Sequence, residues 1–378
     1  MLEDLKVYFV MDPIRGGGSR NVFTLVKLLD DLGSESKVLS FHSMKYLDLL
    51  WRRKPVFNFY GARRISPGNM LSMVDSITSF SENLNYWVLP VYVFQQFFTR
   101  PIILSRYDIP DVYIATNWQS FVPAVKTASR NGRRVAYFVQ GDETEFSDSR
   151  LYRKEALRTY TNDFPKFTQS RWLAEEMSRK FSVDVNYIGF GIDHTVFYPR
   201  EVEKENVIFT IARSEKIKGF SSFINAVNRL WSKRQDFKVL IAGHKNIVEK
   251  SAMEFPYTYL GWITDDEEMA RLYSKSIFVN TGLNEALPMP PLEAMACGGT
   301  VVMTSNGGSV EYAKDMENCL LVNPNDDSEL TNKLDFVLST IGIRDELKKG
   351  AISTAMRYNW QDFMQKFKKF MEKEVLKC

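Results

Sequence analysis

The sequence has few of the residues that build a disulfide framework or a zinc site. It contains only three cysteines and three histidines among 378 residues. The cysteines, Cys297, Cys319 and Cys378, are odd in number and show no Cys-x-x-Cys spacing. Such a set is typical of reduced thiols. We therefore expect neither disulfides nor a cysteine-ligated metal.

The sequence also lacks a membrane-spanning run and a secretory signal. Its strongest apolar run, Tyr86–Phe94, ends at Gln95, well short of the roughly 20 residues that a membrane-spanning helix needs. The first residues, Met1–Lys6, are acidic and lack the basic and apolar regions of a signal peptide. We expect a cytoplasmic protein.

Neither positive nor negative residues are in large excess, since the formal net charge is +3. This balance does not indicate a nucleic-acid partner. Within residues 42–106, however, basic side chains alternate with aromatic ones, among them Lys45, Arg52, Arg53, Lys54, Trp51 and Phe57. Such a surface could contact an anionic membrane peripherally or hold an anionic acceptor. A solvated face over buried aromatic residues explains the pattern equally well.

Short apolar segments alternate with helical patterns in two successive runs, which predicts an α/β fold with two doubly wound parallel sheets. The strands expected in the first run are Leu5–Met11, Lys37–Phe41, Asp111–Thr116, Arg134–Val139 and Asp184–Ile188. Those expected in the second run are Asn206–Ile211, Phe237–Ile241, Ser276–Asn280 and Thr300–Met303. A turn rich in glycine, followed by charged residues, separates the runs. We expect domains at 1–190 and 206–356, a linker at 191–205 and a final helical segment at 357–378.

The stretch Asn284–Ala296 carries the strongest functional signal. Because an expected strand ends at Asn280 and Pro290-Pro291 can open a helix, Glu285 is predicted in a loop and Glu293 in the first helical turn. Loop amides and a helix N-terminus suit an anion, while two carboxylates can accept hydrogen bonds from hydroxyls. A sugar nucleotide presents both groups. Spacing alone equally allows two carboxylates that serve only as solvated or helix-stabilising charges.

The pattern Glu-x7-Glu followed by Ala-Met-Ala-x-Gly resembles the signature of family 4 glycosyltransferases, retaining enzymes of the GT-B fold. The resemblance implies that Glu285 holds hydroxyls of the transferred sugar and Glu293 holds the ribose diol. It also places Leu287, Pro288 and Met289 beside the donor. The family usually has glycine at the position of Pro288, so one backbone amide that could face the donor is missing.

Two further segments of the second half carry the same resemblance. In Ala212–Phe220, an arginine and a lysine before a glycine imply that Arg213 and Lys218 neutralise the donor diphosphate. Arginine can bind phosphate bidentately and lysine adds a point charge, although either alone is more commonly a solvated charge. The pattern Gly-Gly-x-x-Glu assigns Gly308 and Glu311 to the donor site, in a glycine loop before a helix.

The glycine turn after the first strand contains Gly16 and Gly17. The same family carries such a turn near the donor phosphates, whereas a plain strand-to-helix turn is the alternative. The turn is not a dinucleotide fingerprint, because Asn21 stands where the third glycine belongs.

Polar residues also follow the strand expected at Arg134–Val139. In the family a histidine there commonly touches the transferred sugar, but this chain has Gln140. Gln140, Asp142 and Glu143 are the candidates for contact with the sugar or acceptor. The local sequence Tyr-Phe-Val-Gln is similar to some bacterial rhamnosyltransferases of the family.

Together these patterns imply a GT-B fold with two Rossmann-like domains facing across a cleft, the first binding the acceptor and the second the nucleotide sugar. The implied reaction moves a sugar to an acceptor hydroxyl with retention, in cell-surface glycan or glycolipid synthesis. Because Asp-x-Asp, a manganese-binding signature of other glycosyltransferases, is missing, we expect no metal or other cofactor. A catalytically silent sugar-nucleotide-binding protein and a nicotinamide-dependent dehydrogenase are the alternatives. The sequence leaves the base, the sugar and the acceptor open.

Overall fold

The computed structural model describes residues 2–11, 17–40, 104, 108–146, 149–203, 205–213 and 216–377. The chain forms two compact units. The first unit contains Met1–Gln169, Leu173–Ile188 and Met364–Cys378, and the second contains Ser170–Trp172 and Gly189–Phe363. Apart from Leu104, the basic and aromatic segment at 42–106 lies outside the described residues.

The first unit is built on a six-stranded parallel sheet with the strand order β2-β1-β3-β4-β5-β6. Its strands are β1 (Lys6–Met11), β2 (Glu35–Ser40), β3 (Val112–Ala115), β4 (Arg134–Phe138), β5 (Lys166–Thr168) and β6 (Asn186–Tyr187). Its helices include α1 (Gly17–Asp31), η2 (Glu143–Glu145), α5 (Trp118–Asn131), α6 (Arg150–Tyr160) and α7 (Arg171–Phe181). β3 and most of β1 and β4 are buried, as expected for a parallel sheet covered by helices.

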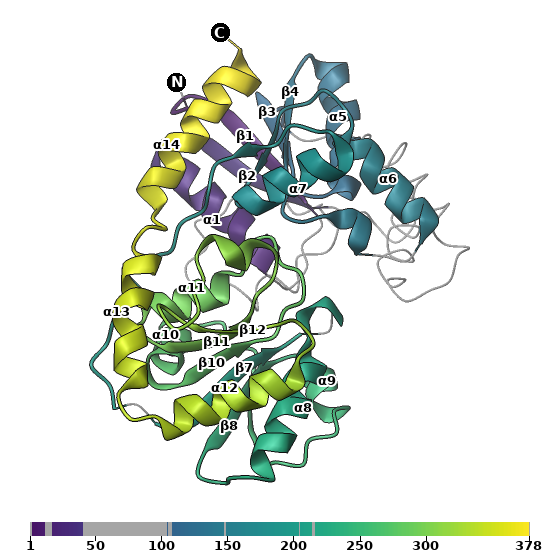
Figure 1. Ribbon diagram of the computed structural model, residues 1–378. Coiled ribbons are helices and arrows are strands. Elements are labelled where there is room, and N and C mark those ends of the chain that lie inside the picture. Colours follow the sequence, from purple (N-terminus) through teal and green to yellow (C-terminus); the bar gives the residue numbers. More distant parts are fainter. Residues whose placement is uncertain are drawn as a thin grey trace, which may run out of the picture. The chain divides into compact units, whose positions relative to one another are not determined.

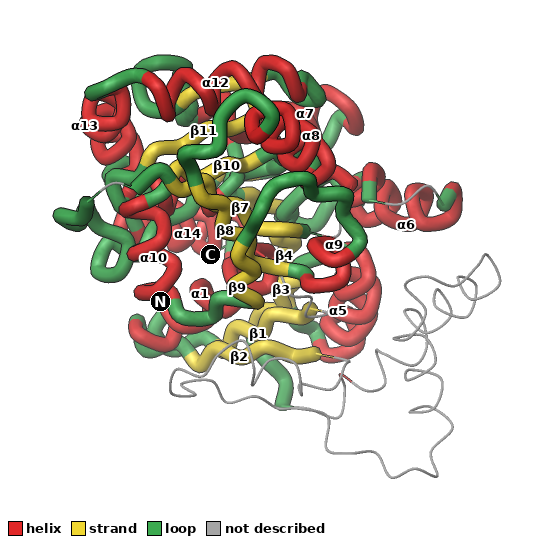
Figure 2. The backbone as a smooth tube through the Cα atoms, turned by 90° about the horizontal axis from the view of Figure 1, so that it is seen from below, coloured by secondary structure: helices red, strands yellow, loops and turns green. Residues whose placement is uncertain are grey.

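The second unit is built on another six-stranded parallel sheet, with the order β12-β11-β10-β7-β8-β9. Figure 2 shows β11, β10, β7, β8 and β9 as a row of strands. The strands are β7 (Val207–Ala212), β8 (Lys238–Gly243), β9 (Thr258–Gly261), β10 (Ile277–Asn280), β11 (Thr300–Thr304) and β12 (Leu320–Val322). The helices are η3 (Lys216–Lys218), α8 (Phe220–Trp231), α9 (Lys245–Glu249), α10 (Asp266–Lys275), α11 (Met289–Ala296), η4 (Gly307–Glu311), α12 (Asp327–Ser339) and α13 (Ile343–Ala355).

Helices cover both faces of the second sheet. Helices α8 and α12 pack side by side on one face, and α10, α11 and α13 lie together on the other (Figure 1). Strand β7 is the first of the unit yet lies inside the sheet, because the chain adds β8 and β9 on one side and β10 to β12 on the other. The strand order therefore reverses between β7 and β10, and such reversals create a crevice outside the carboxyl ends of the strands.

The last helix, α14 (Trp360–Phe370), lies within the final segment, 357–378, that the sequence predicts to be helical. Its apolar face is core, since Phe363, Phe367 and Phe370 are buried. The helix contributes to both units, since the division falls between Phe363 and Met364. It continues into a π-helical turn at Met371–Leu376.

Gly219 is the N-cap of α8, and its substitution tests how closely the backbone of the second unit is packed. Its φ is +63°, and a Cβ there would lie 2.0 Å from the carbonyl oxygen of Thr281. Gly219→Ala should therefore lower the free energy of unfolding by about 3 kcal/mol, from strain and a backbone clash together. Urea denaturation followed by tryptophan fluorescence measures this loss.

Gly261→Ala is the matched control in the same unit. Gly261 has a φ of +72°, but no described atom lies within 4 Å of the position of its Cβ. Gly261→Ala should therefore lower the free energy of unfolding by only about 1 kcal/mol, from backbone strain alone. Equal losses in the two variants would show that the close approach at Thr281 is not a packing constraint.

Candidate functional site

Three loops follow the neighbouring strands β7, β10 and β11, at residues 213–219, 281–288 and 305–311. We refer to them as the three-loop edge. The first two loops are joined directly: the Leu283 amide donates to the Ile217 carbonyl over 2.7 Å, and the Thr281 hydroxyl donates to the Lys218 carbonyl over 3.3 Å. The strands thus bring together loops that lie more than 60 residues apart in the sequence.

The third loop is held against the second by backbone contacts. The Gly308 amide donates to the Glu285 carbonyl over 2.7 Å, and the Asn306 side-chain amide donates to the Gly282 carbonyl. A Cβ at Gly308 would lie 1.6 Å from the Ala286 carbonyl oxygen, so only glycine allows this approach.

An ion pair joins two of the predicted site residues within the three-loop edge. Nζ of Lys218 lies 3.1 Å from Oε2 of Glu285, and the two side chains are 29% and 11% exposed. The sequence placed both residues at a donor site but gave no reason to pair them. Because the pair is largely shielded from water, its attraction is stronger than that of a fully exposed pair.

Arg213 connects the three-loop edge with residues that follow β8 and β9. Its guanidinium carbon lies 5.9 Å from the ring centroid of Trp262, and the Trp262 ring is 4.9 Å from that of His244. His244 and Trp262 follow β8 and β9, so they are further polar and aromatic groups at the carboxyl ends of the strands. The sequence predicts no strand at the position of β9, so it does not place Trp262 at a strand end; His244 follows an expected strand, but no motif points to it.

The structure corrects the expected position of Glu293. Helix α11 begins at Met289, with Pro288 as its N-cap, so Glu293 is its fifth residue and the first turn contains no acidic side chain. Glu293 is 4% exposed. The expectation was wrong because it started the helix at the two prolines, whereas the turn already closes one residue earlier.

The N-terminus of α11 offers few hydrogen-bond donors. A helix normally presents four free amides at its start, but the N-cap is Pro288 and the second and third helical residues are Pro290 and Pro291. Proline has no N–H, so only Met289 retains an amide at these four positions. An anion at this edge would therefore depend mainly on side-chain cations.

Leu287, Pro288 and Glu311, which the sequence also assigned to the donor, lie in the same three-loop edge. Leu287 is buried, and the Pro288 carbonyl accepts a hydrogen bond from the Tyr312 hydroxyl over 2.8 Å. Burial raises the pKa of Tyr312 well above its ordinary value, which keeps the hydroxyl a donor. Glu311 accepts hydrogen bonds from the Ser170 hydroxyl and the Trp172 amide, at 2.6 and 2.7 Å.

In the first unit, Gln140 follows β4 and approaches the start of α1. Its Oε1 lies 3.3 Å from the position that a Cβ of Gly18 would occupy. Gln140 and Gly18 are therefore neighbours in space. Gly17 is the first residue of α1, and Gly16 lies outside the described residues.

Asp142 and Glu143 both have partners inside the first unit. Asp142 caps the short helix η2 and lies 3.2 Å from Nζ of Lys180. Glu143 is 4% exposed, and its carboxylate accepts hydrogen bonds from the Tyr137 hydroxyl at 2.5 Å and the Trp118 amide at 2.9 Å. Glu143 thereby accepts a hydrogen bond from one of the free amides at the N-terminus of α5. A sugar hydroxyl would have to compete with these contacts.

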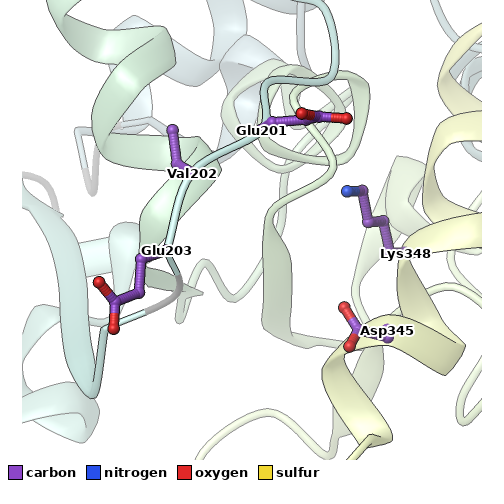
Figure 3. Close-up of a pocket in the computed structure, with 5 residues that line it drawn as sticks. All are labelled: Glu201, Val202, Glu203, Asp345 and Lys348. Carbon is purple, nitrogen blue, oxygen red and sulfur yellow. The ribbon is translucent and has the colours of Figure 1, made fainter.

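A hollow of about 570 Å³ lies on the second unit (Figure 3). Glu201, Val202 and Glu203 line it from one segment, and Asp345 and Lys348 line it from α13. None of the predicted site residues lines this hollow. Among the described residues there is also no cluster of three or more side chains that could bind a metal.

Residues 194–354 match the model of the family described as Glycosyl transferases group 1. The matched segment includes the whole three-loop edge. An N-acetylgalactosaminyltransferase of Campylobacter jejuni, which acts on N,N'-diacetylbacillosaminyl-diphospho-undecaprenol, is 26% identical over 46% of this chain and 46% of its own. The MMP alpha-(1->4)-mannosyltransferase of Mycolicibacterium hassiacum is 28% identical over 52% and 54%. The chain thus spans about half the length of these curated relatives.

Solved structures extend the similarity to almost the whole chain. TarM matches with a TM-score of 0.75 at 12% identity, over 97% of this chain and 99% of TarM. HepE of Anabaena, solved in complex with UDP and glucose, matches with a TM-score of 0.74 at 15% identity, over 97% and 99%. These neighbours are glycosyltransferases of the GT-B type, and the chain has the GT-B fold. No helix among the described residues is long and apolar enough to cross a membrane.

The buried carboxyl of Glu143 predicts a pH dependence of stability. Burial raises its pKa from an ordinary 4.5 to about 7. The folded chain then holds this proton more tightly than the unfolded chain does, so Glu143 lowers the free energy of unfolding as pH rises from about 4.5 to about 7. Glu143→Gln should remove this loss, so that the variant gains stability relative to the wild type across that range.

Urea denaturation at a series of pH values measures this difference. Glu175→Gln, which removes an exposed carboxyl on α7, is the control and should follow the wild-type profile. A constant difference between Glu143→Gln and the wild type at all pH values would contradict the assignment.

Proposed function

We propose that this chain is a glycosyltransferase that moves a sugar from a nucleotide-diphosphate sugar to an acceptor hydroxyl with retention of configuration. The observation that carries the proposal is the ion pair of Lys218 and Glu285. It combines a phosphate-binding cation and a hydroxyl-binding carboxylate at the point where strand order reverses. This point lies inside the segment that matches the glycosyltransferase family model.

The proposed donor contacts follow from the chemistry of these groups. Lys218 and Arg213 take up the negative charge that develops on the departing diphosphate, which stabilises the transition state electrostatically. Glu285 accepts hydrogen bonds from hydroxyls of the transferred sugar, and Glu293 accepts from the ribose diol. The latter two roles rest on the resemblance of the Glu-x7-Glu pattern to the retaining family. Because two cations supply the positive charge, we propose that the reaction needs no metal ion.

The proposed acceptor is a sugar, a glycan or a lipid-linked sugar in cell-surface glycan or glycolipid synthesis. The named activity of the Campylobacter relative, which uses an undecaprenol-linked acceptor, supports this class. So does the 26% identity to an O-antigen biosynthesis protein of Myxococcus xanthus, over 84% of this chain. We assign acceptor binding to the first unit, and contact with either an anionic membrane or the acceptor to residues 42–106.

A catalytically silent sugar-nucleotide-binding protein is the second candidate. The three prolines at the start of α11 favour it, because they remove amides that could stabilise a departing diphosphate. Transfer to an acceptor separates the two candidates, whereas donor binding does not.

Calorimetric binding of UDP, GDP, dTDP and ADP, each alone and as the glucose conjugate, tests the donor site. At least one nucleotide should bind, and more weakly at higher salt, because dissolved ions screen the attraction between the diphosphate and the partly exposed cations. Lys218→Ala should weaken binding about ten- to hundredfold, the usual range for a lost charge-assisted hydrogen bond.

Lys333→Ala is the control for loss of charge. Lys333 is an ion-paired cation of the same unit that lies on α12, outside the three-loop edge, so its loss should leave nucleotide affinity unchanged. Transfer to a panel of methyl glycosides, with and without EDTA, then tests catalysis, and the anomeric proton coupling of the product tests retention. If no nucleotide binds, or if Lys333→Ala weakens binding as much as Lys218→Ala, the donor assignment is wrong. Inhibition by EDTA would contradict metal independence.

A further inference from the structure

The two members of the ion pair are assigned to different parts of the same donor. Lys218 is proposed to bind the diphosphate and Glu285 to bind sugar hydroxyls. In the structure, however, each is occupied by the other, with Nζ and Oε2 3.1 Å apart. The contact uses one of the three N–H donors of Lys218 and one acceptor site of Glu285, so each side chain must share or exchange this partner when it binds its part of the donor.

Several backbone amides of the three-loop edge are not free to bind a diphosphate. The amide of Leu283 donates to Ile217, and that of Gly308 donates to Glu285. The prolines of α11 remove three of the four amides at its N-terminus. These losses increase the share of the positive charge that Lys218 would supply to a diphosphate at this edge.

Glu285 in turn needs a partner when Lys218 leaves. Its side chain is only 11% exposed, and a shielded carboxylate that loses its cation is costly. Oε1 lies close to the backbone of Gly282, 2.0 Å from the position that a Cβ there would occupy. A sugar hydroxyl that donates to Oε2 would replace the lost partner.

We propose that the Lys218–Glu285 ion pair couples recognition of the diphosphate to recognition of the transferred sugar. A nucleotide sugar draws Lys218 to its phosphates and supplies a hydroxyl to Glu285. A nucleoside diphosphate without sugar draws Lys218 away but leaves Glu285 without a partner, and therefore binds less tightly. This inference rests on the proposed function and identifies Glu285 as the residue that distinguishes a loaded donor from the spent nucleotide.

Glu285→Gln tests the coupling, because glutamine keeps the shape of the side chain and removes its charge. The variant should bind UDP about three- to tenfold more tightly than the wild type, since Lys218 no longer has to leave a carboxylate. It should not bind UDP-glucose more tightly, because the charge-assisted hydrogen bond to the sugar is lost at the same time. If the nucleotide panel selects another base, the corresponding nucleotide and its glucose conjugate replace UDP and UDP-glucose.

A double-mutant cycle distinguishes this coupling from simple repulsion between Glu285 and the diphosphate. The coupling requires Lys218, so Glu285→Gln should not raise UDP affinity when it is introduced into Lys218→Ala. An equal gain in both backgrounds would show that only repulsion is relieved, and would overturn the inference. A matching unfolding midpoint of Glu285→Gln and the wild type confirms that the variant is folded.

The outcomes also separate the inference from the proposed function. If the wild type binds none of the nucleotides, the proposed function fails and the coupling fails with it. If the wild type binds UDP but Glu285→Gln binds it equally or more weakly, the coupling alone is wrong. Tighter binding of both UDP and UDP-glucose by the variant would also contradict it, because Glu285 would then have no role in holding the sugar.

Discussion

The site depends on one constraint, the close backbone contact between loops that follow three neighbouring strands. The Leu283 amide reaches the Ile217 carbonyl and the Gly308 amide reaches the Glu285 carbonyl, so the strands fix the distance between Lys218 and Glu285. Gly219 and Gly308 are needed because any side chain there would strike a carbonyl oxygen of the adjoining loop. The chemistry of the site thus follows from the strand order of a parallel sheet and from the position where that order reverses.

This constraint has an electrostatic consequence. Loops packed this closely use their amides for one another, and the prolines of α11 remove others. Positive charge for an anionic ligand must then come from side chains, chiefly Lys218 and Arg213. A lysine ammonium is mobile and can exchange partners, whereas a backbone amide is fixed. The dependence on a mobile cation is what allows Lys218 to hold Glu285 in the free chain and a phosphate in the complex.

The sequence predicted the two parallel sheets well, because each long strand is a continuous apolar run such as Lys6–Met11 or Val207–Ala212. It missed β5, β9 and β12, which have three or four residues each and too little sequence for any periodicity to appear. For the candidate site, the sequence identified the charged residues that follow the strands, such as Arg213, Lys218 and Glu285. It could not reveal the contact between Lys218 and Glu285 or the structural partners of Glu143, because these depend on tertiary packing and on the exact start of each helix.

A crystal structure of the chain in complex with UDP tests the central claim most directly. The account predicts that a phosphate oxygen of UDP takes the place of Glu285 Oε2 beside Nζ of Lys218, at the carboxyl ends of β7 and β10. A diphosphate bound elsewhere on the second unit, with the Lys218–Glu285 ion pair unchanged, would contradict it.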